Sequence, residues 1–341
     1  MLKVAAFTGG LNEPSARFRL RQYIPILKEQ NIEVTDFYSK MGKYPPENKL
    51  IRPLWAFATL SMRIPDIVKS YNYDITFLQR EMLSTFTTFE LLTKSPRVLD
   101  VDDAIFLYRF GKFAKRLAQL SELVICGNNF IAEWFSKWNK NIVVIPTAVD
   151  THRYIPRKEN HPSQCKLVLG WIGTSGNFKY LYRIESALER VIKAQPGIIF
   201  KIISDSKPIF KGKLSEKLEY VKWSPENEIV NIQNMTIGIM PLDNTEWEKG
   251  KCSFKMLQYM ACGIPVVVSH VGMNSQVLSL GEAGIGAKSQ EEWVEAILTL
   301  LSLNDIERKK IGMIGRRIVE EYFSIDMIAP RLAGHLRGLL V

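Results

Sequence analysis

Histidine and cysteine are scarce in this sequence, and their spacing is irregular. Neither the four cysteines nor the four histidines fall at the spacing of a metal site. No histidine lies at a spacing from serine or cysteine that indicates a catalytic triad. The sequence therefore gives no support to a hydrolase or a metalloenzyme, and we expect the cysteines to be small buried residues. The residues concerned are Cys126, Cys165, Cys252, Cys262, His152, His161, His270 and His335.

Long apolar runs are also lacking. The longest, Gly263–Val268 and Leu298–Leu303, are far shorter than the roughly 20 residues that a membrane span requires. The N-terminus carries only the short run Val4–Phe7 before Gly-Gly and arginine, which is typical of a buried strand and its loop rather than of a signal peptide. These absences predict a cytoplasmic protein.

Charge of one sign is not concentrated in either half of the chain. The formal net charge is +10, with 20 basic and 15 acidic residues in 1–150 and 25 and 20 in 151–341. A mild excess of this kind suits anionic partners such as phosphorylated small molecules, acidic lipid headgroups or nucleic acid. No zinc-finger, helix-turn-helix or aromatic-rich RNA-binding motif is found, so nucleic acid is not expected as a partner.

What the sequence does have is repeated alternation of strands and helices. The 341 residues, 46% of them hydrophobic, suit two α/β domains. A helix is expected from Pro14-Ser15, and its buried face comprises Ala16, Leu20, Tyr23 and Leu27. Strands are expected at Leu2–Phe7, Ile32–Tyr38, Asp74–Leu78, Arg97–Val101, Leu123–Cys126 and Ile142–Ile145.

Residues 146–164 hold three prolines and no periodicity, which predicts a linker. Alternation then resumes, and predicts a doubly wound parallel sheet in each half with ligands at the carboxyl ends of the strands. We expect domains at 1–150 and 165–325, and a C-terminal helix at 326–341 that could cross back to the first domain. The second set of strands is Leu167–Gly173, Ile198–Ile203, Leu218–Trp223, Thr236–Met240 and Pro265–Ser269, with helices at about Tyr180–Ala194, Asp305–Tyr322 and Asp326–Leu340.

The most informative segment is GKCSFKMLQYMACGIPVVVS, residues 250–269. Ser253 suits an N-cap, and Gly263 suits the C′ residue of a short helix that ends near Ala261. Lys255 then falls in the first turn, where a cation is unfavourable unless an anion binds there. Lys251 adds a second charge. The segment thus favours a phosphate-binding helix end, although an exposed lysine pair on an ordinary helix remains an alternative.

This segment resembles the donor-site helix of the retaining family 4 glycosyltransferases of GT-B fold. Their pattern is a Glu, seven residues, a second Glu and an Ala-Met-Ala-x-Gly-x-Pro-Val-Val-like run. Here Gly250 and Gln258 stand at the two Glu positions, which in the family contact the sugar and the donor ribose. Glutamine can still hydrogen-bond a hydroxyl, without charge. Lys251 and Lys255 match a subset of the family with a Lys-Cys-x-x-Lys-Leu loop.

The run LGWIGTSGNFKYL, residues 169–181, is similar to the strand and loop that begin the family's second domain. Lys179 matches a diphosphate-binding lysine, and Thr174 stands where an arginine is usual. An exposed first-turn lysine is the alternative for Lys179. Thr236–Leu242 and Ile145–Asp150 are similar to further family runs. The donor-binding residues expected are Gly9, Gly10, Gly173, Thr174, Lys179, Lys251, Ser253, Phe254, Lys255 and Gln258.

In the first domain, Gly9-Gly10 permits a tight turn and close approach to a phosphate, although a plain turn is equally compatible. Arg17, Arg19 and Arg21 open the next helix and could hold an acceptor or donor phosphate. A solvated helix face is the alternative.

Asp100, Asp102 and Asp103 lie in LDVDDAIF, where the predicted strand Arg97–Val101 ends. The resemblance implies a loop that presents a side chain to the acceptor or sugar, with Asp102 matching best and Asp103 next. Helix N-capping by either residue is the alternative. We therefore expect Asp102 and Lys255 to be catalytic and Arg17, Arg19 and Asp103 to bind the acceptor, with no metal.

The resemblance implies a metal-independent, retaining transferase that moves a sugar from a UDP- or GDP-linked donor to an acceptor hydroxyl, with no further cofactor. Lysines and a helix N-terminus would stabilise the leaving diphosphate. A nucleotide-sugar epimerase of the same fold and a non-catalytic sugar-nucleotide-binding protein remain alternatives. Neither sugar, base nor acceptor is defined by the sequence.

Residues 50–70 mix aromatic and basic side chains. Trp55, Phe57, Leu60 and Ile64 stand beside Arg52, Arg63 and Lys69, a combination that suits an anionic membrane surface. This pattern predicts peripheral docking on the inner face of the membrane and a lipid-linked or other glycan acceptor, as in polysaccharide or glycolipid synthesis. A core helix of the first domain is the alternative.

Overall fold

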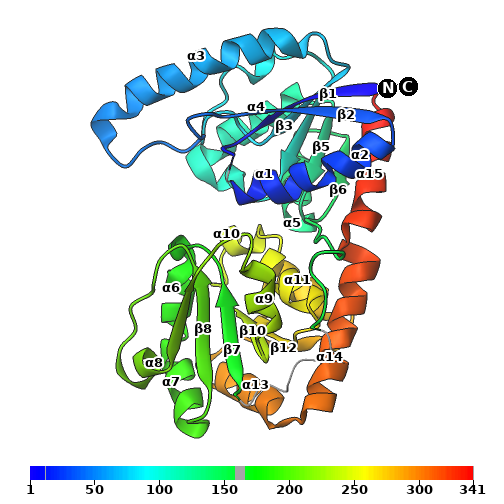
Figure 1. Cartoon of the computed structure of the whole chain (residues 1–341). Coiled ribbons are helices and arrows are strands. Elements are labelled where there is room, and N and C mark those ends of the chain that lie inside the picture. The colour runs from blue at the N-terminus through cyan, green and yellow to red at the C-terminus, as the bar shows by residue number, and fades with distance from the viewer. Residues whose placement is uncertain (12, 158–165, 341) are drawn as a thin grey trace. The chain divides into compact units, whose positions relative to one another are not determined.

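The structure is a computed structural model in which residues 1–11, 13–157 and 166–340 are described (Figure 1). The chain forms two units. Unit 1 comprises Met1–Ala148, Lys249–Cys252 and Ile325–Val341, and unit 2 comprises Val149–Glu248 and Ser253–Ser324. Cys165, His161 and the end of the predicted linker lie outside the described residues. The other three cysteines are buried, as predicted.

Unit 1 is built on a six-stranded parallel sheet in the order β2-β1-β3-β4-β5-β6. One hydrophobic cluster of its core includes Leu20, Tyr23 and Leu27 from the helical stretch 14–29 that follows β1. The strands are β1 (Leu2–Thr8), β2 (Ile32–Tyr38), β3 (Ile75–Gln79), β4 (Arg97–Val101), β5 (Leu123–Cys126) and β6 (Ile142–Val144). The α-helices are α1 (Pro14–Arg19), α2 (Ile24–Glu29), α3 (Arg52–Ser70), α4 (Lys112–Leu120), α5 (Asn129–Phe135) and α15 (Ile325–Arg337).

Helix α15 belongs to unit 1 although it is the last helix of the chain. It lies beside α2, and it places Ile328, Leu332 and Leu336 in the core of unit 1. A side chain of this size stabilises a fold by about 1.5–3 kcal/mol when it is fully buried. The N-terminal strand and the C-terminal helix therefore share one core.

Unit 2 repeats the architecture with another parallel sheet, in the order β12-β11-β10-β7-β8-β9. Its strands are β7 (Val168–Ile172), β8 (Ile199–Ser204), β9 (Leu218–Lys222), β10 (Ile237–Met240), β11 (Val266–Ser269) and β12 (Gly284–Ala287). Its α-helices are α6 (Phe178–Arg183), α7 (Glu185–Ala194), α8 (Gly212–Glu216), α9 (Glu228–Gln233), α10 (Glu246–Lys249), α11 (Phe254–Ala261), α12 (Gly272–Leu278), α13 (Gln290–Ser302) and α14 (Asp305–Ile318).

The expected strands are confirmed within about two residues, and so is the end of α11 at Ala261 before Gly263, whose φ is +70°. One expectation is wrong, one strand was missed, and one expected helix changes its hydrogen-bonding pattern near its end. The helix expected over Tyr180–Ala194 is divided at Ile184 into α6 and α7. Strand β12 was not predicted, because Gly-Ile-Gly-Ala has little strand pattern. The last long helix ends at Ile318 and continues as a π-helical turn.

The strand order reverses once in each sheet, between β1 and β3 in unit 1 and between β7 and β10 in unit 2. Ligands of doubly wound folds bind outside the carboxyl ends of the strands at such a point. Gly9 and Arg80 follow the two strands of unit 1, and Gly173 follows β7 of unit 2. These loops are therefore the places where a ligand is expected from the fold.

Candidate functional site

In unit 2, Lys255 reaches the loop after β7. Its Nζ lies 5.8 Å from the ring centre of Trp171, a buried residue of β7. A Cβ atom at Gly173 would lie 2.5 Å from the Cε atom of Lys255, so a larger residue at this position would displace the Lys255 side chain from its present place. The structure thus brings together Gly173 and Lys255, two of the residues predicted to bind the donor.

Lys179 lies on α6 beside a buried carboxylate that the sequence did not reveal. Its Nζ is 3.9 Å from Oε1 of Glu248, whose side chain is 2% exposed, whereas the Lys179 side chain is 59% exposed. Tyr180 and Thr245 both donate hydrogen bonds to the Glu248 carboxylate. Glu248 is held firmly, and Lys179 extends from it toward solvent, where it can reach an anion.

Ser253 does not cap α11 with its side chain, contrary to expectation. It adopts a left-handed conformation with φ 52°, and its hydroxyl donates to Oδ1 of Asn274 at 2.7 Å. Only its carbonyl takes part in the first turn, as the acceptor for Leu257. A serine hydroxyl turned away from the helix end leaves the first turn without its own side-chain acceptor, which suits an external anion.

Gln258 faces the interior of unit 2. It is 3% exposed, and its Nε2 donates to Oε1 of Glu228 at 2.6 Å and to the Tyr154 hydroxyl at 3.0 Å. Its amide nitrogen is therefore engaged by two protein groups. A ribose contact by Gln258 stays a prediction, which would have to use the amide oxygen or displace one of these bonds. Thr174 is exposed on the loop, and Phe254 opens α11.

Lys251 belongs to a short segment, Lys249–Cys252, that is part of unit 1. Nδ2 of Asn128 donates to the carbonyls of Lys249 and Lys251, at 3.2 Å each, and the Cys252 thiol donates to the carbonyl of Asp102 at 3.2 Å. A Cβ atom at Gly250 would lie 2.7 Å from the Cβ of Ala104. Gly250 therefore cannot be replaced by a glutamate without movement of the backbone.

The loop after β1 is tied down by Arg21, which donates to the Gly10 carbonyl, to the Thr8 hydroxyl and to Asp36. The Glu13 side chain folds over Gly9, where a Cβ atom would lie 1.3 Å from Oε2 of that carboxylate. A carboxylate thus occupies the place predicted for a phosphate. Phosphate binding at Gly9 and Gly10 stays a prediction that requires Glu13 to move.

Arg19 is buried and engaged within unit 1. It forms a bidentate ion pair with Asp100, in which Nη2 lies 2.5 Å from Oδ1 and Nε lies 3.1 Å from Oδ2. Its Nη1 donates to the Ile145 carbonyl and to the Thr147 hydroxyl. Burial alone would lower the pKa of Arg19, but the Asp100 carboxylate raises it. Burial likewise raises the pKa of Asp100, against the effect of Arg19. The pair ties α1 to β4, which leaves Arg17, with its guanidinium 4.7 Å from the Phe18 ring, as the more accessible arginine.

Asp102 and Asp103 follow β4 and meet Arg80, which follows β3. Nη1 of Arg80 is 2.9 Å from Oδ2 of Asp103 and 3.7 Å from Oδ1 of Asp102. Burial and the neighbouring Asp102 raise the pKa of Asp103. Neither aspartate caps the 3-10 turn Ile105–Gly111, whose N-cap is Ala104 without a side-chain bond. The capping alternative is therefore wrong.

Helix α3 does not have the buried apolar face of a core helix. Its buried residues are Thr59, Arg63, Ile67 and Ser70. The side chains on the opposite face are apolar and exposed, and Figure 1 shows the helix along the outside of unit 1. The exposed side chains, with those of the preceding turn, are Leu50, Ile51, Leu54, Phe57, Ile64 and Val68, exposed by 48 to 89%.

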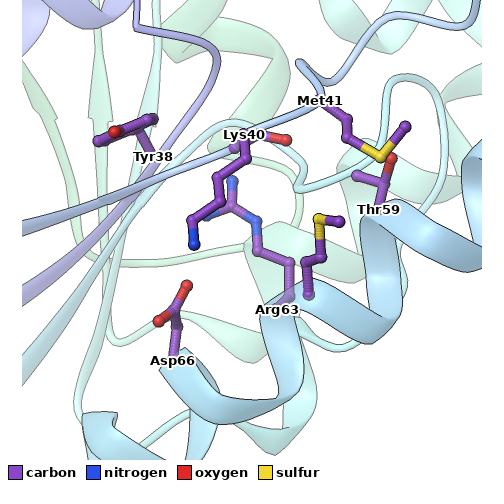
Figure 2. A pocket seen from close by; sticks show the side chains of 8 residues that line it. Tyr38, Lys40, Met41, Thr59, Arg63 and Asp66 are labelled. Atoms are coloured by element: carbon purple, nitrogen blue, oxygen red, sulfur yellow. The ribbon is translucent and has the colours of Figure 1, made fainter.

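Arg63 was expected to face lipid, and that expectation is wrong. Its guanidinium points inward and donates to the carbonyls of Phe37 and Thr8, at the carboxyl ends of two strands. Figure 2 shows it in a small pocket beside α3, together with Lys40 and Asp66. Trp55 and Leu60 are half-buried. No helix in the described part of the chain is both long and apolar enough to cross a membrane.

Three residues of the site were not predicted from the sequence: Arg80, Glu248 and Lys43, a buried residue whose Nζ lies 3.7 Å from Oε2 of Glu13. Arg80 had a signal, since it lies two residues after the predicted strand Asp74–Leu78, just as Asp102 follows the predicted strand Arg97–Val101. Lys43 and Glu248 lie in polar stretches without a pattern. Among residues 1–11, 13–157 and 166–340, no three histidine, cysteine or acidic side chains gather as a metal site would require.

Comparison with known proteins relates this chain to sugar-transferring enzymes. Residues 166–303 match the family model described as glycosyl transferases group 1. No curated protein matches the sequence. Among solved structures, sucrose-phosphate synthase from Thermosynechococcus elongatus is 16% identical with a TM-score of 0.75, covering 100% of this chain and 99% of that one.

Two further structures show the same fold along the whole chain. Anabaena HepE, solved in complex with UDP and glucose, is 14% identical with a TM-score of 0.69, covering 99% of this chain and 100% of that one. A glycosyltransferase from Rickettsia africae is 14% identical with a TM-score of 0.68, covering 99% and 98%. These likenesses confirm the predicted pair of Rossmann-like sheets.

Proposed function

We propose that this chain, of which residues 166–303 match the model of the glycosyl transferases group 1 family, is a nucleotide-sugar-dependent glycosyltransferase. It binds a UDP- or GDP-linked sugar on unit 2 and transfers the sugar, with retention, to an acceptor hydroxyl held by unit 1. The observation that carries the proposal is the arrangement of Lys255, which lies on the first turn of α11 and against Gly173 at the strand reversal. HepE was solved with UDP, which favours uridine as the base.

The proposed chemistry is electrostatic. As the bond between the sugar C1 and the diphosphate oxygen breaks, negative charge grows on the diphosphate, and Lys255 with the α11 N-terminus stabilises it. Lys179 and Lys251 add positive charge. The acceptor oxygen bonds to C1, and its proton leaves on the diphosphate. The step requires no protein base and no metal.

On the acceptor side we assign Asp102 and Asp103 to the hydroxyl that attacks, and Arg17 of α1 to a further contact with the acceptor. Asp102 and Asp103 accept hydrogen bonds and can orient that hydroxyl, while Arg80 keeps the two carboxylates in place. Arg19 acts only through Asp100 and is a positioning residue in this proposal. A carboxylate that fixes an acceptor lowers the entropic barrier to transfer.

The test is a thermal-shift panel of nucleoside diphosphates and their sugars, followed by donor hydrolysis and transfer assays. We expect one nucleoside diphosphate to raise the melting temperature, as ligands of the folded state do, and the matching sugar nucleotide to be hydrolysed slowly. Binding without hydrolysis or transfer would favour the non-catalytic alternative. Conversion of the bound sugar nucleotide into its epimer would favour an epimerase.

We further propose that the exposed apolar face of α3 docks on an anionic membrane surface. Leu54, Phe57, Ile64 and Val68 share that face, and Lys49 and Lys69 are exposed at its two ends. Apolar side chains that enter the lipid interface and basic ones that meet acidic headgroups are the pattern of a peripheral helix, each basic residue adding about 1 kcal/mol. Docking of this kind on the inner face suits a lipid-linked acceptor of glycolipid or polysaccharide synthesis.

Vesicle sedimentation tests this docking. Vesicles with phosphatidylserine should pull down the wild type at low salt, and Leu54→Ser with Phe57→Ser should release it. Ile306→Ser is the matched control, since Ile306 is a 69% exposed apolar residue of a unit 2 helix. Equal sedimentation of the double variant and the control, or none by the wild type, removes the membrane from the proposal.

A further inference from the structure

Six charged side chains gather at the strand reversal of unit 1, and we call them the reversal cluster. They come from four loops, each of which follows a strand of the sheet at its carboxyl end. Ligands of doubly wound sheets bind at this place. The members are Glu13 after β1, Lys43 after β2, Arg80 and Glu81 after β3, and Asp102 and Asp103 after β4.

The cluster is enclosed and its charges are close together. Lys43 is 1% exposed with its Nζ 3.7 Å from Oε2 of Glu13, and Arg80 is 4% exposed between the two aspartates. The Ser84 amide donates to the Lys43 carbonyl at 2.9 Å, which joins the two loops. Arg80 has a left-handed backbone, with φ 62°, an unusual conformation for a residue with a side chain. Such strain is typical of functional sites.

Several polar atoms of the cluster are buried and yet form no hydrogen bond with the described residues. They include donors and acceptors alike: Nζ of Lys43, Nε of Arg80, Oε2 of Glu13, Oε2 of Glu81 and Oδ1 of Asp102. A buried polar group without a partner costs about 1–3 kcal/mol, so folded proteins keep few of them. Their concentration at one strand reversal indicates that a polar ligand completes the bonding.

The charge balance decides which ligand chemistry fits. The cluster holds four carboxylates and two cations, so a phosphate would meet more repulsion than attraction. A sugar hydroxyl donates one hydrogen bond and accepts others, and it carries no charge. Adjacent hydroxyls can therefore satisfy the carboxylates and the two cations together.

Resting on the transferase function proposed above, we propose that the reversal cluster binds the sugar residue that bears the acceptor hydroxyl, and that this residue is a neutral sugar rather than a phosphorylated headgroup. Lys43, Arg80, Glu13 and Glu81 are then acceptor-specificity residues beside Asp102 and Asp103. A lipid that carries the acceptor contributes its phosphate elsewhere, beyond this neutral sugar.

Saturation-transfer NMR on the full chain with UDP present tests the proposal. The probes are methyl glycosides of glucose, galactose, mannose and N-acetylglucosamine, each with its 6-phosphate. We expect at least one neutral glycoside to bind, and its 6-phosphate to bind at least tenfold more weakly. Lys43→Met and Glu81→Gln should each weaken that glycoside at least tenfold. Lys40→Met, an exposed lysine of the same loop, is the matched control and should have no effect.

Thermal melting separates binding from a structural role. Because the buried Lys43 ammonium forms no hydrogen bond with the described residues and lies 3.7 Å from its ion-pair partner Glu13, its removal costs little, and we expect the melting temperature of Lys43→Met to equal or exceed that of the wild type. A lower melting temperature with unchanged glycoside affinity makes Lys43 a structural residue and overturns the proposal. So does tighter binding of a sugar phosphate, or the absence of any neutral ligand. If Lys43→Met fails to fold, the glycoside affinity of the isosteric variant Glu81→Gln decides whether the reversal cluster binds the sugar. UDP binding and donor hydrolysis on the same samples report separately on the transferase function.

Discussion

The two units share one architecture, yet the carboxyl ends of their sheets carry different charges. In unit 1 this edge is lined by carboxylates whose cations, Arg19, Lys43 and Arg80, are buried beside them. In unit 2 the corresponding edge offers Lys179, which is 59% exposed, and Lys255 on a helix N-terminus. An acidic edge with enclosed cations suits hydroxyl groups, whereas accessible lysines suit a diphosphate. This contrast supports our proposal that unit 2 binds the donor and unit 1 binds the acceptor.

The largest effect should come from breaking the ion pair inside unit 1. Arg19→Met leaves the Asp100 carboxylate buried without its partner, which should lower the free energy of unfolding by about 3–5 kcal/mol. Lys255→Met in unit 2 should change the free energy of unfolding by less than about 1 kcal/mol, because the Lys255 side chain is only partly buried, whereas Arg19 and Asp100 are both enclosed. Urea denaturation of both variants measures this. A similar loss of unfolding free energy in the two variants would mean that the Lys255 cation contributes as much to stability as the Arg19 cation, and would contradict the contrast between the units.

The next effect concerns turnover. Lys255→Met should reduce transfer by roughly 10²–10³-fold, the usual loss when one group that stabilises the leaving charge is removed. Its affinity for UDP should fall about tenfold or more, since a charge-assisted contact contributes about 1.5–3 kcal/mol. Steady-state kinetics and calorimetry give the two values. Unaltered UDP affinity would place the diphosphate elsewhere.

A smaller loss is expected for Lys179→Met. This side chain is largely exposed and already 3.9 Å from Glu248, so its contact with the diphosphate is screened by water. UDP affinity should fall about three- to tenfold. Lys207→Met, an exposed lysine of the same unit, is the control. A loss as large as that for Lys255 would contradict the ranking of the two lysines.

No effect at all is expected from removing divalent metal. The lysines of unit 2 supply the counter-charge that a metal ion would otherwise give to the diphosphate. Turnover in EDTA, with and without added Mg²⁺ or Mn²⁺, checks this. Loss of activity in EDTA that Mg²⁺ or Mn²⁺ restores would make Asp102 and its neighbours metal ligands instead of acceptor groups.

The sequence was sufficient to predict the two sheets, because hydrophobic strands and buried helix faces are local patterns. It also placed Lys255 on the first turn of α11. The sequence could not show which of Arg17, Arg19 and Arg21 is buried. Their spacing shows that they do not all point the same way, but not which side chain points into the protein. The prediction for Arg63 was wrong for the same reason. An arginine on an apolar helix can either face lipid or reach the ends of nearby strands, and tertiary packing decides between the two.

The engaged state of Gln258 and the rotation of Ser253 were equally beyond the sequence. Each depends on a residue distant in the chain, Glu228 for one and Asn274 for the other. The sequence pattern of α3 predicts an apolar face. It does not show whether that face is exposed or buried, because a core helix has the same composition. Charge pairs such as Lys43 with Glu13 also leave no trace in the spacing of residues.

The composition of unit 1 from three separate pieces of chain has a consequence for protein engineering. A fragment that ends at residue 148 or 150 lacks α15, and with it part of the core around Tyr23 and Leu27. Such a truncation should expose that apolar surface and aggregate. The two places where the long pieces join unit 2 are adjacent, since the Val149 amide donates to the Phe323 carbonyl at 2.8 Å. A short fusion of Ala148 to Ile325 would therefore excise unit 2 and return the missing helix to its sheet.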